Sequence, residues 1–140
     1  MRRVIILPLL FAMSAFLCAD EPQTILPKHI QAPSYPVIAK NARIEGEVEV
    51  VVTLDSDGKV SDALAVGVPN VLHRSSVESV RLWTFDRPPM APFKESVFCD
   101  YKLNAARKNA PSEPLVLFDL PNRVTIVATP ERVDTYNSVH

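Results

Sequence analysis

Alternation of apolar and polar residues is the clearest pattern along this chain, and it predicts strands in three places. In residues 44–54, IEGEVEVVVTL, one face of the alternation is apolar and the other is largely acidic. Residues 59–68, KVSDALAVGV, place larger apolar side chains opposite small ones, and residues 95–103, ESVFCDYKL, alternate again. A period of two with one apolar face is typical of a half-buried β-strand. The small-residue face of the second predicted strand could admit a close neighbour.

Helical spacing interrupts the strands twice. Residues 37–43 follow Pro36, which is favoured in a first helical turn, and we expect Val37, Ile38 and Ala42 to form their buried side. Residues 70–83 carry one stripe at i, i+4, i+8 and i+11, which predicts a longer helix capped by Asn70 and ended by the prolines that follow Asp86 and Arg87. The stripe consists of Leu72, Ser76, Val80 and Trp83.

The last part of the chain adds a predicted hairpin. Residues 115–129, LVLFDLPNRVTIVAT, contain two short apolar runs separated by Pro121 and Asn122, which are turn residues. The elements therefore follow one another as short helix, two strands, longer helix, strand and hairpin. This order predicts an α+β fold, with helices on one face of an antiparallel sheet.

The N-terminal 19 residues have the plan of a cleavable signal peptide. Two arginines precede an apolar run, and Ala19 stands before the expected cleavage site. The run is shorter than the ~20 residues that cross a bilayer, and Pro8 interrupts it, so an uncleaved anchor and lipidation of Cys18 are the less favoured alternatives. We expect a periplasmic protein in which residues 20–31 form an extended, proline-containing lead-in.

Charge and cysteine content exclude further classes. Removal of the signal peptide would take away two arginines and leave 13 basic against 16 acidic residues, a formal net charge of −3. A mildly acidic chain without a basic stripe argues against nucleic-acid binding. The processed chain would keep one cysteine, Cys99, so no disulfide could form within it and its stability would depend on a packed core.

Candidate chemical sites do not survive a check of their spacing. The stretch TLDSDGKVSD, residues 53–62, resembles a calcium loop, but counted from Asp55 the fifth position, which needs an oxygen ligand, is Lys59, and glycine comes two positions early. We expect it to be a turn between strands. The three histidines share no metal-ligand spacing, and Cys99 belongs to the apolar face of its strand, where it would pack as a small hydrophobe. We therefore expect no enzyme, no metal and no cofactor.

Four of these segments, in this order, resemble the C-terminal domain of TonB, the energy transducer of the Gram-negative cell envelope. They are SYPVIAKNARIEGEVEVVV, LDSDGKV, LHRSSVESVRLWTFDRP and ESVFCDYKL, which together run from about Ala32 to Leu103. The resemblance implies a three-stranded antiparallel sheet packed on two helices, as a domain of residues 32–104. Residues 105–140 would then be a C-terminal extension that carries the hairpin.

The resemblance also implies where a partner binds. Domains of this family contact outer-membrane transporters, whose TonB-box segment adds as a strand beside the sheet. An open edge suits such a partner because it presents unpaired backbone N–H and C=O groups. The implied partner-binding residues are Ala32, Pro33, Ser34 and Tyr35, and Val97, Phe98, Cys99, Asp100, Tyr101, Lys102 and Leu103.

Two functions follow as hypotheses. The first is an exported module that recognises an envelope protein or peptide by strand addition. The N-terminal segment lacks the family's Ser-x-x-x-His membrane pattern and a long proline-rich spacer, so we expect a role beside TonB-dependent transport rather than energy transduction itself. The second is a self-associating scaffold component of the envelope, whose hairpin covers the sheet edge or pairs between two chains.

Overall fold

A computed structural model describes residues 23–104 and 113–130 of the chain. The predicted signal peptide, residues 1–19, lies outside the described residues, as do parts of the lead-in and of the C-terminal extension. The elements are, in order, β1 (Pro27–His29), α1 (Val37–Asn41), β2 (Gly46–Leu54), β3 (Val60–Val66), a 3₁₀ turn (Asn70–Leu72), α2 (His73–Val80), β4 (Thr84–Phe85), β5 (Phe93–Leu103), β6 (Leu115–Asp119) and β7 (Arg123–Ala128).

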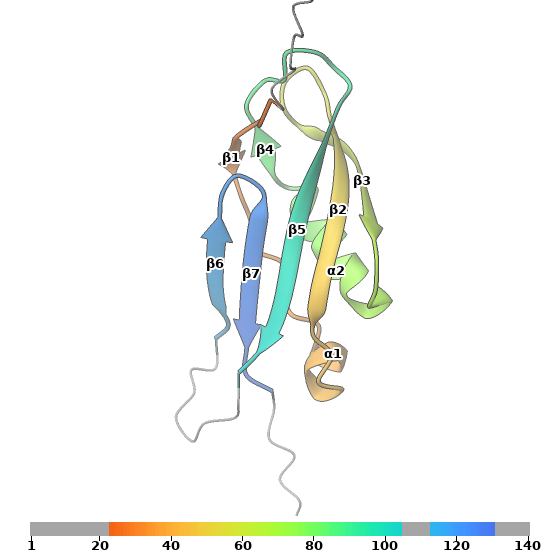
Figure 1. Ribbon diagram of the computed structural model, residues 1–140, viewed down its shortest axis with the longest axis vertical. Helices are drawn as coiled ribbons and strands as arrows, with labels where there is room; N and C mark the ends of the chain where they lie inside the picture. Colours follow the sequence, from red (N-terminus) through yellow and green to blue (C-terminus); the bar gives the residue numbers. More distant parts are fainter. Residues whose placement is uncertain (1–22, 105–112, 131–140) are drawn as a thin grey trace, which may run out of the picture.

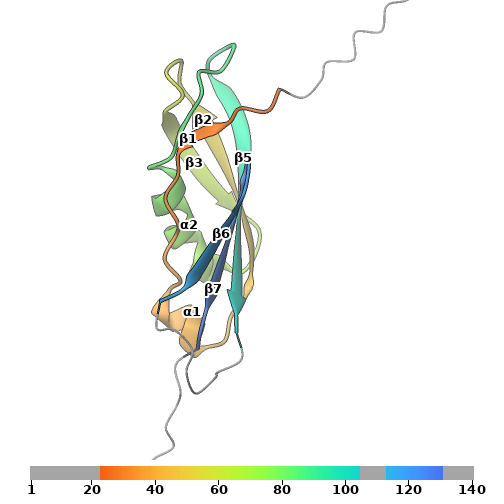
Figure 2. The same ribbon diagram turned by 90° about the vertical axis from the view of Figure 1, so that its left-hand side faces the viewer.

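The main sheet has five strands in the order β3-β2-β5-β7-β6 (Figure 1). Strands β2, β3 and β5 pair antiparallel, as predicted, and the C-terminal hairpin also forms. The sheet is larger than the predicted three strands and is mixed, because β7 joins β5 in parallel. Strands β1 and β4 make a separate two-stranded sheet. The α+β class is confirmed, with both helices on one face of the main sheet (Figure 2).

The core lies between this sheet and α2, and it contains the residues that alternation selected. The valines at 48, 50 and 52 on β2 are 0% exposed, and so are five side chains of the neighbouring strands β5 and β7: Val97, Cys99, Tyr101, Val124 and Ile126. From the helix side, Leu72, Ser76, Val80 and Trp83 are all buried, so the predicted stripe is confirmed. Ser76 donates its hydroxyl hydrogen bond to the Leu72 carbonyl at 2.9 Å, which satisfies a polar group inside the core.

Strand β3 turns its small residues inward. Ala63 is buried and Ala65 packs against the core, whereas Leu64 is 63% exposed on the face without helices. The close neighbour that this small-residue face admits is α2, which packs over β3 and β2. A helix and a sheet approach closely where small side chains separate them, so Leu64 and Val66 of β3 are left on the outer face.

Both helices differ in detail from their prediction. In α1 the buried residue is Ala39, while Val37 and Ile38 are 58% and 67% exposed, so the predicted buried side is wrong. The five-residue helix docks through its smallest apolar side chain, which brings its backbone close to the core. Asn70 begins the 3₁₀ turn without making a side-chain cap. Helix α2 ends at Val80, well before the prolines.

Candidate functional site

Strand β5, which carries seven of the predicted partner-binding residues, lies in the middle of the sheet. Its pairing with β2 covers one side, and Phe98 to Leu103 pair with Arg123 to Ala128 of β7 on the other. At the two ends of this pairing, the Phe98 amide donates to the Asn122 carbonyl at 2.7 Å and the Asn104 amide donates to the Ala128 carbonyl at 2.9 Å. The expectation that β5 is an open edge is therefore wrong, because the hairpin occupies that edge.

The side chains of β5 divide between the core and the open face of the sheet. Val97, Cys99 and Tyr101 are 0% exposed and face the helices. Their neighbours Asp100 and Lys102 lie on the opposite face, where they form an ion pair at 3.1 Å. Only the outward set can touch another molecule while the hairpin is in place.

Contacts on the open face hold the hairpin against β5 and β2. The Arg123 guanidinium is ion-paired with Glu47 of β2 and lies 5.2 Å from the centroid of the Phe98 ring. The side-chain amide of Asn122 donates to the Ser96 carbonyl at 3.1 Å. On the inner face, β7 buries Val124 and Ile126 completely. The hairpin is thus a part of the core and of the sheet.

A buried tyrosine pair connects β5 to the other predicted binding segment. The rings of Tyr35 and Tyr101 meet edge to face, with centroids 5.3 Å apart. The Tyr35 hydroxyl donates to the Ile44 carbonyl at 2.6 Å, and the Tyr101 hydroxyl lies 2.8 Å from the Ser76 hydroxyl. Burial raises the pKa of both tyrosines to about 12. The structure therefore brings the two predicted segments together, with both tyrosines in packing positions.

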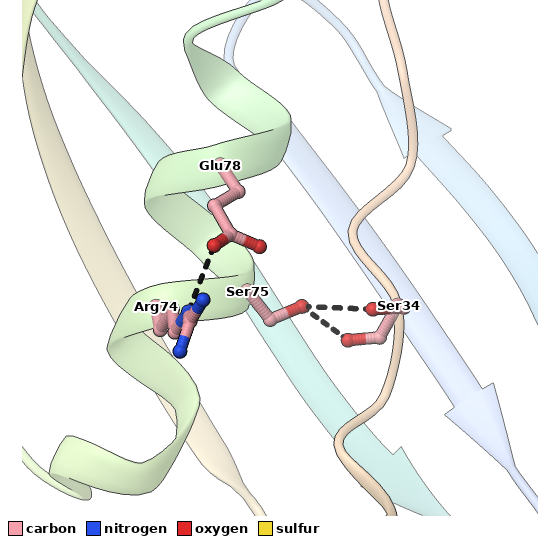
Figure 3. A network of polar contacts seen from close by, with 4 residues as sticks. All are labelled: Ser34, Arg74, Ser75 and Glu78. Carbon is pink, nitrogen blue, oxygen red and sulfur yellow. Dashed lines mark hydrogen bonds and ion pairs between the residues drawn. The ribbon is translucent and has the colours of Figure 1, made fainter.

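The residues before Tyr35 form one wall of a groove beside α2. Residues 31–34 face Ser75, Glu78, Ser79 and Leu82 across a cavity of about 270 Å³. The Ser75 hydroxyl donates to the Ser34 carbonyl, and the Arg74 and Glu78 side chains pair at 2.8 Å along the helix (Figure 3). The indole N–H of Trp83 donates to the Gln31 carbonyl at 2.8 Å. Of the predicted binding residues here, Ser34 is exposed, Ala32 is half-buried and Pro33 is buried.

The stretch that resembled a calcium loop is a turn between β2 and β3. One Asp55 carboxylate oxygen accepts hydrogen bonds from the Asp57 and Lys59 amides, at 2.9 and 3.0 Å. Gly58 has a φ of 81°, which suits glycine, and its carbonyl accepts the Phe85 amide at 2.8 Å. No group of three or more possible metal ligands occurs within residues 23–104 and 113–130.

Cys99 is packed between strands. Its Cα partners are Val48 on β2 and Val124 on β7, both of which are also buried. The pKa of the Cys99 thiol is raised to about 12, because the effect of burial exceeds the opposite effect of a hydrogen bond to Ser76. A thiol held in its protonated form is a poor nucleophile. The prediction that Cys99 packs in the core is confirmed.

Sequence reasoning did not identify the outer side of β6 as an exposed surface. Leu115 and Leu117 are 55% and 52% exposed, and Phe118 is 41% exposed. The only signal was the unbroken apolar run LVLF, which has no alternation and so assigns no residue to a buried face. Its position at the outside of the sheet follows from the insertion of β7 between β5 and β6.

Comparison with known proteins matches residues 31–114, which is more than half of the chain, to the family described as Gram-negative bacterial TonB protein C-terminal. The match ends one residue before β6. Among solved structures, the solution NMR structure of the Pseudomonas aeruginosa TonB C-terminal domain is 28% identical to this chain, with a TM-score of 0.41. It is matched over 57% of this chain and 86% of its own length. No curated protein matches.

No helix within the two described ranges is long and apolar enough to cross a membrane. The matched residues contain both helices, the three antiparallel strands β2, β3 and β5, and the groove beside α2. The chain belongs to the family of TonB C-terminal domains.

Proposed function

We propose that this chain is an exported periplasmic module that recognises an envelope protein or peptide by strand addition and performs no chemistry of its own. Membership of the TonB C-terminal family supports a protein-interaction role, since domains of this family bind outer-membrane proteins. An outer-membrane transporter is therefore the partner class that we propose first. The single observation that carries the mechanism is a sheet whose outer strands, β3 and β6, have no strand partner within the described residues on their outer sides.

The partner strand is best accommodated on β3. This edge spans seven residues, and Leu64 and Val66 beside it are exposed on the open face of the sheet. An extended peptide gains affinity from main-chain hydrogen bonds and specificity from alternate side chains, and both are available here. Addition to β5 would instead require the hairpin to leave, with loss of the buried contacts of Val124 and Ile126.

The groove beside α2 is the proposed second contact. Ser34 lies on its rim, and the buried tyrosine pair fixes the segment that carries it. A segment that is already ordered loses little conformational entropy when a partner binds. The proposal also divides the chain into four parts. These are a signal peptide (residues 1–19), a lead-in (residues 20–31), the binding domain (residues 32–104) and its extension (residues 105–140).

Photo-crosslinking in the envelope tests this function. A benzoylphenylalanine residue at Leu64 or Ser34 should give an adduct with a specific envelope protein, whereas the same residue at Ser56, on the exposed tip of the β2–β3 turn, should not. The same residue at Lys102, which is exposed on β5, tests for a partner at the β5 edge that the sequence predicted. Absence of any adduct from Leu64 and Ser34, with the protein folded and exported, would refute the proposal.

A disulfide across the β5–β7 pair separates binding at an open edge from displacement of the hairpin. Asp100 and Thr125 are Cα partners on the open face, so cysteines at both positions should cross-link within the range that a disulfide spans. Adducts from Leu64 should persist in the locked protein. Adducts that come only from Lys102, and only in the reduced protein, would show instead that the partner replaces the hairpin.

A further inference from the structure

The outer side of β6, which we call the β6 edge, combines unpaired backbone with exposed apolar side chains. Within the described part of the chain, β6 pairs only with β7. Leu115, Leu117 and Phe118 on the strand, and Leu120 just after it, are each between 41% and 55% exposed. An exposed apolar edge of this kind is a template for pairing with another strand.

The β6 edge has few of the features by which proteins protect strand edges. Leu115–Asp119 carries one charge, Asp119 at its end, contains no lysine and no proline, and pairs with β7 without a register shift. The opposite edge differs, because β3 carries Asp62 in mid-strand and its pairing with β2 shifts register between Thr53 and Leu54. Natural edges are usually blunted by charge, proline or a bulge, so an apolar edge whose one charge stands at its end is expected to be covered.

We propose that the β6 edge is covered by β6 of a second copy of this chain, in antiparallel orientation about a twofold axis at Leu117. This register places Leu117 opposite Leu117 of the second copy, Val116 opposite Phe118, and Leu115 opposite Asp119. Cross-strand apolar pairs of this type stabilise a sheet, and no like charges face each other. The two sheets become one continuous ten-stranded sheet.

Charge selects the antiparallel arrangement. In this register the two Asp119 carboxylates are four residues apart along the strands, or about 14 Å at ~3.4 Å per residue, which exceeds the Debye length of ~8 Å at physiological salt. A parallel pairing in register would instead bring them side by side. Across the hairpin, the Cα partner of Asp119 is the positively charged residue Arg123. The twofold arrangement also closes both β6 edges at once, whereas a head-to-tail contact would leave one of them open.

The edge is preformed, which favours association. Val116 packs against the core, and β7 holds the full length of β6 in register. Five paired residues bury less than the ~800 Å² per partner of a standard stable interface, so we expect a dimer that forms reversibly and depends on protein concentration. This inference is independent of the proposed transporter partner, which would use β3 and the α2 groove.

Sedimentation equilibrium of the processed chain, residues 20–140, tests the dimer. We expect a monomer–dimer equilibrium, which Leu117→Lys should weaken at least about tenfold because it places two lysines opposite each other at the axis. Leu64→Lys is the matched control, since Leu64 is also an exposed leucine, on the opposite edge strand, and it should leave the dissociation constant of the dimer unchanged. Trp83 fluorescence establishes that both variants are folded.

Cysteine cross-linking locates the axis. Leu117→Cys should oxidise to a covalent dimer, because directly opposite residues in an antiparallel pair have Cα atoms ~4.5–5.5 Å apart. Leu115→Cys should not, because Asp119 lies opposite it. A chain that stays monomeric at all concentrations, a dimer that Leu64→Lys disrupts and Leu117→Lys does not, or equal cross-linking of both cysteine variants would overturn the inference.

Discussion

The substitution Ile126→Ala tests whether the C-terminal hairpin belongs to the core. Ile126 lies in the middle of β7, with Tyr101 of β5 and Val116 of β6 as its Cα partners, and its side chain is 0% exposed. Truncation of a fully buried isoleucine to alanine typically costs 2–5 kcal/mol, from lost burial and from the cavity that remains. We expect about 3 kcal/mol here, which is a large part of the roughly 5–15 kcal/mol that stabilises an ordinary domain.

Urea unfolding followed by Trp83 fluorescence measures this change. Trp83 is the only tryptophan of the chain and is 1% exposed, so its emission should shift when the core opens. Thr125→Ala is the control, because Thr125 is the neighbouring residue of the same strand and faces the open side of the sheet. It should change the free energy of unfolding by less than about 1 kcal/mol. If Ile126→Ala were as mild as Thr125→Ala, the hairpin would not be part of the core.

One further substitution and one labelling reaction test the packing inside the domain. Gly58→Ala should destabilise the domain by about 2 kcal/mol or more, because the added Cβ would lie 2.1 Å from the Phe85 carbonyl oxygen and φ is 81°; an unchanged melting temperature would contradict this close approach. Cys99 should stay unreactive toward Ellman's reagent at pH 8 in the native protein and react on unfolding, because burial raises the pKa of its thiol to about 12. The raised pKa also makes the free energy of unfolding depend on pH. The contribution of Cys99 to stability is fully present below pH ~8.5, where the unfolded thiol is protonated, and it is lost as the pH rises toward 12. Rapid labelling of the native protein would show that the site is open.

Strands were the part of the fold that the sequence predicted well. A strand with one buried face repeats every two residues, so Val48, Val50 and Val52 could be assigned to one side without knowledge of what covers them. The order of strands in the sheet carries no such local signal. The parallel pairing of β7 with β5 joins Phe98 to Arg123, and nothing in either segment alone specifies that partner.

Short helices were harder to predict for a related reason. In α1 the apolar residues Val37 and Ile38 were expected inside, but the fold places Ala39 there. A helix of five residues has little more than one turn, so its periodicity cannot distinguish between faces. Around α2 the same method succeeded, because four residues spaced from the 3₁₀ turn to just beyond the helix, Leu72 to Trp83, define one buried stripe.

The candidate site changed because binding by strand addition depends on which edge is free. The predicted residues of β5 are placed correctly on a strand, but β7 occupies their edge and buries Val124 and Ile126. Full burial of such side chains is worth ~1.5–3 kcal/mol each, so expulsion of the hairpin would cost roughly 3–6 kcal/mol. A partner that had to displace it would bind about a hundredfold to ten-thousandfold more weakly than one that finds an open edge. The hairpin therefore closes the edge at β5 and presents a new edge at β6, which moves the expected sites of strand addition to the outer strands of the sheet.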